Sequence, residues 1–164
     1  MVIVDFYRGN RTNNMGDSYA DIMAWTDEQL EFDHDYIQWM FPSNESSKLN
    51  TDSPTLTKEE SLIFESDPVL QSKVREFAVR FIDFLGFKLE SGKIEPKGDD
   101  IPLFLRGPFN HNILRVTRML KSLRLTGNSD LAEAIFNALI ELKNLVSQST
   151  WNHWNNAANN PLWE

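Results

Sequence analysis

Residues 110–125 carry four polar side chains spaced about one helical turn apart: His111, Arg115, Arg118 and Ser122. At 100° per residue they fall within about 60° of one another on a helix, opposite its apolar face. Two arginines and a histidine so placed could hold a carboxylate or a phosphate through forked hydrogen bonds. The small hydroxyl of Ser122 would leave room for a ligand. The alternative is a solvated polar face that pairs with acidic residues elsewhere in the chain.

A second polar pair lies in the segment HDYIQWMFP, residues 34–42. His34 and Gln38 are four positions apart, and both side chains can donate and accept hydrogen bonds. The apolar members of the segment share another helical face and are expected in the core: Tyr36, Trp39 and Met40. A histidine with acidic neighbours is more often a structural hydrogen-bond partner than a catalytic base. A His34 or His111 base with arginine clamps for an anionic substrate is nevertheless an alternative reading.

Motifs for metal or cofactor chemistry are missing from the sequence. The chain has no cysteine, which excludes disulfides, thiolate zinc sites and a cysteine nucleophile. Its three histidines, His34, His111 and His153, lack ligand spacing, and no glycine-rich phosphate loop or nucleophile elbow is present. The sequence therefore predicts no metal and no cofactor, and it favours a non-enzymatic protein.

The charge is acidic overall but unevenly distributed. The net charge is −8, which argues against sequence-independent nucleic-acid binding because such binding depends on neutralising phosphates. Residues 1–70 contain 4 Lys/Arg against 14 Asp/Glu, whereas residues 101–129 contain five basic residues and no acidic one. Either the two parts complement each other inside the fold, or the basic segment receives an anionic group from outside.

Periodicity and capping signals predict a mainly α-helical protein. Its 164 residues suit a compact single-domain bundle of five to seven helices, with a small β-hairpin near residues 87–95. Thr26 and Thr57 each begin a capping box, and Asp67–Pro68 begins a long helix that Gly86 ends. The helices are expected at about 18–24, 27–40 with a break near Asp33, from Thr57, 68–85, 110–125 and 129–148, the last of them central because it is apolar on two sides.

The last sixteen residues, 149–164, differ in composition from the rest. They are rich in asparagine but hold three tryptophans, Trp151, Trp154 and Trp163. Since each indole can bury about 200 Å², we expect this tail to pack on the domain formed by residues 1–148, or on a partner that the tryptophans bind.

The start, MVIVDFYRGN, is no signal peptide, and no apolar run reaches the roughly 20 residues of a membrane span, so a soluble cytoplasmic protein is expected.

Two segments resemble the signatures of a known family. Residues 34–42 are similar to H-x-Y-I-Q-W-x-F-P, and residues 110–123 (NHNILRVTRMLKSL) are similar to H-N-x-L-R-I-T-R-x-L-K-S-L, both from the conserved region of the opioid growth factor receptor. Smaller matches lie at Phe6–Tyr7–Arg8, Trp25, Leu56–Thr57 and Phe84–Leu85–Gly86–Phe87. The resemblance covers most of residues 5–145, in the family's order, and suggests a short stand-alone member.

The resemblance implies a module that binds rather than reacts. In animal members this region belongs to a receptor for an enkephalin-type peptide, one that is associated with the nucleus and has no membrane span. We therefore expect the polar faces of the two signature segments to line one groove for a peptide or a small anion, or else to bond to each other as a structural seam. The groove residues would be His34, Gln38, His111, Arg115, Arg118 and Ser122. An enzyme and a protein–protein interaction or oligomerisation domain are the alternatives.

Overall fold

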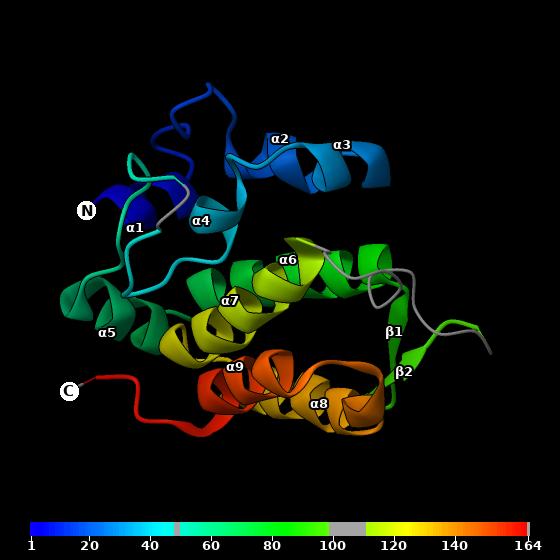
Figure 1. Ribbon diagram of the computed structural model, residues 1–164. Coiled ribbons are helices and arrows are strands. Elements are labelled where there is room, and N and C mark those ends of the chain that lie inside the picture. The colour runs from blue at the N-terminus through cyan, green and yellow to red at the C-terminus, as the bar shows by residue number, and fades with distance from the viewer. Residues whose placement is uncertain (48–49, 99–110, 164) are drawn as a thin grey trace.

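The computed structural model describes residues 1–47, 50–98 and 111–163. These residues form a mainly α-helical fold with one short hairpin, as the sequence predicts (Figure 1). Nine α-helices lie within the described part of the chain: α1 (Val2–Tyr7), α2 (Tyr19–Met23), α3 (Asp27–Phe32), α4 (Ile37–Met40), α5 (Lys58–Ser66), α6 (Pro68–Leu85), α7 (His111–Leu125), α8 (Ser129–Ile140) and α9 (Gln148–Asn159).

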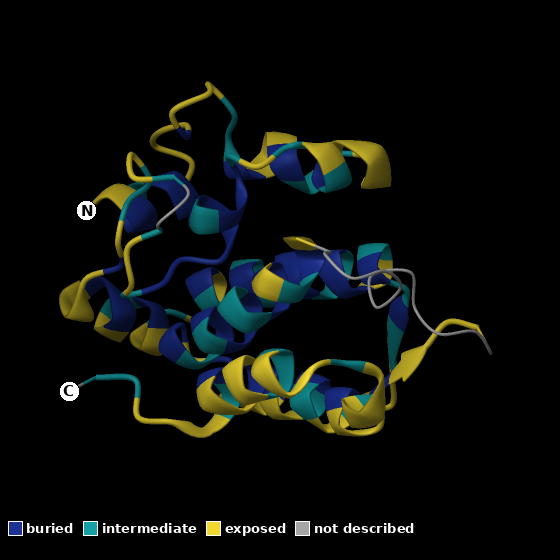
Figure 2. Cartoon of the chain, in the orientation of Figure 1, coloured by how far each residue is buried: buried dark blue, intermediate teal, exposed yellow. Residues whose placement is uncertain are grey.

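The helices are arranged in layers around α6 and α7. In the view of Figure 1, α1 to α4 lie above these two helices, and α8 and α9 lie below them. The helix α7 packs against α5, α6, α8 and α9, and the buried faces of α6 and α7 lie in the middle of the molecule (Figure 2). The sequence prediction that residues 129–148 form the central helix was wrong. The central helix is α7, whose polar side is covered as well as its apolar side.

Local signals set most helix boundaries where the sequence places them. Capping boxes begin α3 at Thr26 and α5 at Thr57, because each hydroxyl accepts the backbone N–H three residues on and the third side chain returns the bond. Asp67 caps α6, and Gly86 ends it with a φ of 103°, a left-handed conformation that favours glycine. The predicted break near Asp33 is confirmed, since α3 stops at Phe32 and α4 begins at Ile37.

The hairpin and the end of the chain test two further predictions. The strands β1 (Phe87–Glu90) and β2 (Lys93–Pro96) pair antiparallel, with Phe87 opposite Pro96, which confirms the hairpin. The predicted helix 129–148 was wrong in its length. It stops at Ile140, a 3-10 turn follows (η2, Lys143–Leu145), and Ser147 caps a new helix, α9, with its side chain.

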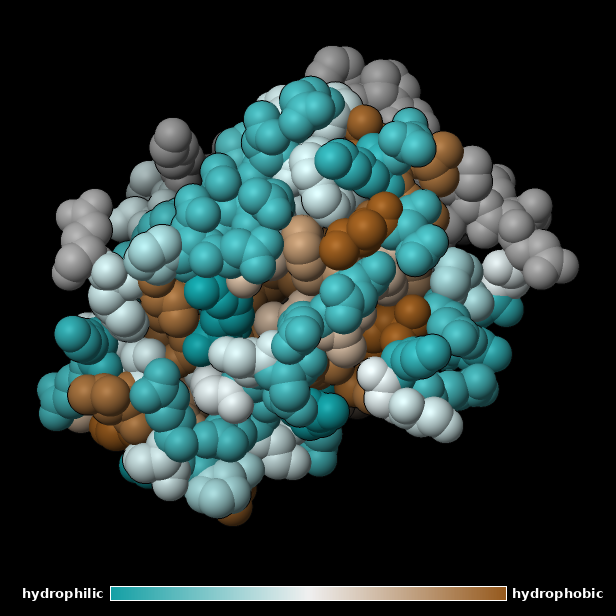
Figure 3. Space-filling model, turned by 90° about the horizontal axis from the view of Figure 1, so that it is seen from below, coloured by the Kyte–Doolittle hydropathy of each residue, from teal (hydrophilic) through white to brown (hydrophobic). Residues whose placement is uncertain are grey.

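The tail packs back on the fold through α9, which contacts α7 and α8. Trp154 is fully buried, and its indole N–H donates to the carbonyl of Ile113 at 3.2 Å. Trp151 is half-buried and stacks on Phe136 with ring centroids 5.3 Å apart, and Trp163 is partly buried against the core. Figure 3 shows the molecule from below, where hydrophilic residues predominate and hydrophobic ones show between them. A partner-binding role of the tryptophans stays a prediction, and Trp154 has no exposed surface to contribute to it.

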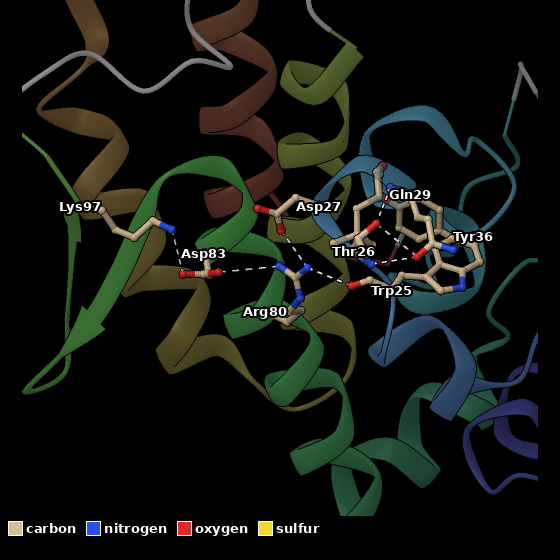
Figure 4. Close-up of polar contacts among 9 residues, drawn as sticks. Trp25, Thr26, Asp27, Gln29, Tyr36, Arg80, Asp83 and Lys97 are labelled. Carbon is tan, nitrogen blue, oxygen red and sulfur yellow. Dashed lines mark hydrogen bonds and ion pairs between the residues drawn. The ribbon is translucent and has the colours of Figure 1, made fainter.

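An arginine of α6 fixes the position of α3 (Figure 4). Arg80 pairs with Asp27 at 2.8 Å and donates to the carbonyl of Trp25 at 3.0 Å, so it holds the start of α3. Trp25 in turn packs edge-on against Tyr36, with ring centroids 5.3 Å apart. These contacts fix the segment that carries His34.

Among the helices described, none is both long and apolar enough to cross a membrane.

Candidate ligand groove

An open groove of about 630 Å³ separates the segment around α4 from the first turns of α7. This volume lies within the roughly 300–1,000 Å³ that small-molecule sites occupy. The structure brings five of the six predicted residues to its walls, while Ser122 is absent from them. The lining residues are His34, Asp35, Ile37, Gln38, Ser47, Asn50, His111, Leu114, Arg115 and Arg118.

Arg115 is a buried guanidinium bonded mainly to backbone. Its Nη1 donates to the carbonyl of Leu30 at 2.7 Å, and its Nη2 donates to the carbonyl of Asp33 at 2.7 Å. The guanidinium also lies over the Tyr36 ring, 5.3 Å from its centroid. Because helix carbonyls near a C-terminus have no partner within the helix, these bonds cap the end of α3. Burial lowers the pKa of Arg115, and burial also raises the pKa of Tyr36.

Arg118 repeats this arrangement one turn later. Its Nε donates to the carbonyl of Phe41 at 2.7 Å, and Nη2 reaches the carbonyl of Gln38 at 3.5 Å, so it caps the end of α4. Burial lowers the pKa of Arg118 to about 10, although Glu45 opposes that shift. In the described part of the chain no carboxylate lies within ion-pair distance of Arg118.

The two predicted histidines meet at one end of the groove. The rings of His34 and His111 lie edge to face with centroids 5.2 Å apart. His111 Nε2 is 3.1 Å from a carboxylate oxygen of Glu31, and His34 Nδ1 is 3.3 Å from Arg115 Nη2. Burial, followed by the charge of Arg115, lowers the pKa of His111, while Glu31 opposes the shift.

Side-chain amides and hydroxyls form the opposite rim. Gln38 Nε2 donates to Ser47 Oγ at 3.4 Å, and Asn50 Nδ2 donates to Asp35 Oδ1 at 3.4 Å. Gln38 Oε1 is buried and has no hydrogen-bond partner among the described residues. Sequence reasoning missed the roles of Ser47 and Asn50, since a long loop shows no period that would place its side chains.

Leu114 was also missed as a groove residue. It is 59% exposed, although it lies on a helix whose other large apolar residues are mostly buried. Its signal was available in the sequence: at 100° per residue Leu114 lies beside Arg118 and away from the core stripe. With Ile37 it adds an apolar surface to an otherwise polar groove.

Ser122 lies elsewhere. Its side chain is fully buried, and its hydroxyl has no hydrogen-bond partner among the described residues. The expectation that this polar stripe lies opposite the core was wrong for Ser122 and for Arg115, which is only 5% exposed. The cause is the central position of α7, because neighbouring elements cover Arg115 and Ser122, while His111 and Arg118 of the same stripe line the open groove.

The two sequence alternatives, a seam and a groove, concern different atoms of the same residues. Bonds from Arg115 and Arg118 to backbone carbonyls join the walls, as a seam would. Charge complementarity contributes through the ion pair of Lys121 with Glu45, and a 3.1 Å contact joins His111 to Glu31. The remaining surface is open and combines a cationic group, side-chain amides and apolar carbon.

Among the residues described, no cluster of three or more histidine, aspartate or glutamate side chains could hold a metal ion.

The fold and the groove define a class of mainly helical domain in which two signature segments, far apart in sequence, form facing walls. Comparison with known proteins gives this class its name. The opioid growth factor receptor (OGFr) conserved region matches residues 1–158, and the chain belongs to this family.

Individual relatives agree with the family assignment. The chain is 34% identical over 128 residues to the human opioid growth factor receptor, an alignment that covers 73% of this chain and 19% of that protein. It is 35% identical over 102 residues to the mouse opioid growth factor receptor-like protein 1, covering 58% of this chain and 21% of that protein. The matched region thus spans about a fifth of these relatives. No solved structure matches.

Proposed function

We propose that this chain is a non-enzymatic binding module whose groove holds a short peptide segment or a small anion. The observation that carries the proposal is the convergence of His34, Gln38, His111, Arg115 and Arg118 on one open groove of about 630 Å³. Binding sites of this kind combine apolar walls with a few polar groups that orient the ligand.

The lining suits a peptide. Gln38 and Asn50 present amides that can bond to a peptide backbone, and exposed Leu114 offers a contact for an apolar side chain. Exposed apolar residues that border polar ones often mark interaction sites. The relatives support this reading in their names, since the human, rat and mouse relatives are each called opioid growth factor receptor.

The test is an NMR titration of the ¹⁵N-labelled protein, of 19.0 kDa, with an enkephalin-type peptide. We expect saturable shift changes at Gln38, His111 and Leu114. Replacement Leu114→Asp should abolish them, because a charge in place of the apolar contact opposes ligand burial. Leu62→Asp is a matched control, since Leu62 is 56% exposed on α5 and lies outside the groove. Shift changes that map elsewhere, or that survive Leu114→Asp, would contradict the groove as the site.

A catalytic role is the second candidate, favoured by the 3.1 Å contact between His111 and Glu31. A carboxylate that orients an imidazole beside a cationic subsite is the arrangement a general base requires. The discriminating measurement is hydrolysis of a p-nitrophenyl ester panel across pH 5–8. A rate limb that disappears in His111→Gln would support catalysis, and a rate equal to that of buffer would count against it.

A further inference from the structure

We infer that the groove recognises its ligand through a carboxylate group, which the guanidinium of Arg118 binds end-on. The inference rests on the proposed function and adds the chemical class of the group that is recognised. Its basis is the unused hydrogen-bonding capacity of Arg118, the lack of a counter-charge for it, and the nature of its neighbours in the groove.

Arg118 uses only one side of its guanidinium within the protein. Its Nε donates to the carbonyl of Phe41, and Nη2 has one long contact of 3.5 Å with the carbonyl of Gln38. Nη1 donates to no partner in the described part of the chain. Both N–H groups of Nη1 and one of Nη2 therefore remain. One from each nitrogen forms the fork whose two bonds a carboxylate accepts with its two oxygens. Arg118 lines the groove, so a ligand that enters the groove can reach this side chain.

Arg118 has no carboxylate partner among the described residues, and the same holds for Arg115 and Arg124, which bond to backbone carbonyls. Other arginines pair with acids: Arg80 with Asp27 at 2.8 Å and Arg75 with Asp130 at 3.1 Å. Arg75 is 40% exposed, so its charge is already well solvated. Arg118 is more deeply placed, and its charge is partly desolvated without an ion pair among the described residues. Arg115 and Arg124 use both of their Nη atoms on carbonyls, whereas Nη1 of Arg118 donates to no described residue, so an acceptor from a ligand would satisfy it.

The neighbours of Arg118 favour a singly charged group over a phosphate. Arg115 lies one turn away, but its Nη groups are bonded to two backbone carbonyls, so it offers little to a second anionic oxygen. Asp35 lines the same groove, and its negative charge opposes a dianion more strongly than a monoanion. Leu114 and Ile37 add apolar surface, as a carboxylate attached to an apolar residue would require. A peptide C-terminus and an acidic side chain both supply this chemistry.

The test uses the wild-type protein and three dipeptides: N-acetyl-Gly-Leu with a free carboxylate, its C-terminal amide, and N-acetyl-Gly-Glu-amide. Inorganic phosphate is a fourth probe, and sodium chloride keeps the ionic strength constant. The readout is the Nε–H cross-peak of Arg118 together with the backbone amides of Gln38 and Leu114. We expect N-acetyl-Gly-Leu to bind at least about tenfold more tightly than its amide, because only the acid can form the charge-assisted fork. The tighter of the two acidic dipeptides identifies the source of the carboxylate.

Each result decides one point. Equal affinities of the acid and the amide, with shifts at Gln38 and Leu114, would overturn the carboxylate while leaving the groove as a binding site. Tighter binding of phosphate at Arg118 would overturn the choice of carboxylate in the same way. If no probe shifts any groove residue, both the inference and the proposed function are contradicted. A tenfold preference that Arg118→Gln removes, in a variant whose circular dichroism matches wild type, would support the inference at this residue.

Discussion

Arg115 Nη1 donates a 2.7 Å hydrogen bond to the carbonyl oxygen of Leu30, across a separation of 85 residues in the sequence. The same guanidinium binds the carbonyl of Asp33 through Nη2. Helices as short as α3 and α4 are marginal alone, since each leaves most of its carbonyls without partners. The arginines of α7 provide those partners, so that α7 stabilises both the fold of the first forty residues and one wall of the groove.

Replacement of Arg115 should destabilise the protein through these carbonyls. We expect Arg115→Ala to lower the free energy of unfolding by about 2–4 kcal/mol, because two buried acceptors lose a charged donor. At about 2–4 °C per kcal/mol, thermal unfolding should shift measurably. Arg75→Ala is the control, since its exposed pair with Asp130 contributes at most about 1 kcal/mol. A similar loss of stability in both variants would contradict the role of Arg115.

Glu60 gives a second prediction, at the N-terminal helix. Its buried carboxylate accepts the backbone N–H groups of Ile3 at 3.0 Å and Val4 at 3.1 Å. Glu60→Gln removes the charge, and we expect a loss of about 1.5–3 kcal/mol with faster hydrogen exchange at the amides of Ile3 and Val4. Glu59→Gln, at an exposed position on the same helix, should leave both amides protected. Unchanged exchange in Glu60→Gln would show that α1 is held by its apolar contacts alone.

His111 predicts how stability depends on pH. Its folded-state pKa lies below the ordinary 6.5, first because of burial and then because of Arg115, so the folded protein disfavours the charged imidazole. As pH falls through 6.5 the unfolded chain takes up the proton first, and the free energy of unfolding decreases until the folded-state pKa is reached. Above pH 6.5 both states hold a neutral His111, and this histidine no longer lowers the free energy of unfolding.

Two measurements check this dependence. In wild type, the ¹H–¹³C signals of His111 should titrate with a midpoint below 6.5. Between about pH 7.5 and pH 5.5, wild type should lose more unfolding temperature than His111→Gln, which has no group to protonate. Glu31→Gln should lower the midpoint further, since Glu31 opposes the shift. A midpoint above 6.5 would mean that the charge of Glu31 affects the pKa of His111 more strongly than burial does.

Trp154 predicts that the C-terminal helix belongs to the folded unit. Its indole is fully buried and its N–H donates to the carbonyl of Ile113. We expect Trp154→Ala to cost about 3–5 kcal/mol, as for other large aromatic side chains in a core. Trp151→Ala should cost less, since that ring is only half-buried. Urea unfolding followed by circular dichroism measures the stability of both variants. Midpoints equal to that of the wild type would indicate that α9 is dispensable.

The elements with local signals were predictable. The capping boxes at Thr26 and Thr57, the apolar stripe of α6 and the left-handed Gly86 are determined by neighbouring residues, and all are present. The helix α1 was missed, because its stability depends on a carboxylate at position 60, far away in the sequence. The end of α8 at Ile140 was missed for a similar reason: the apolar period continues past it, but the chain turns there.

The candidate groove was predictable as a set of residues but not as a geometry. Helical spacing grouped His111, Arg115 and Arg118 and separately paired His34 with Gln38, and the family resemblance suggested that the two sets face each other. All five residues line the groove. Spacing could not show that backbone carbonyls of α3 and α4 would accept hydrogen bonds from the arginines, because every residue has the same backbone carbonyl and its sequence letter does not reveal which one will accept. For that reason the burial of Arg115 was not foreseen.

The separation in sequence between the two walls has a consequence for synthesis. Residues 34–50 emerge from a ribosome well before residues 111–118, and the bonds that join them span 77 to 85 positions. A nascent chain of the first hundred residues thus has unsatisfied carbonyls at the ends of α3 and α4 and has no groove. Trp154 of α9 donates to the carbonyl of Ile113 on α7, so the second wall gains this further support once α9 has been made. A ligand of the groove can therefore bind only after residues 111–118 have been synthesised and have packed against the first wall.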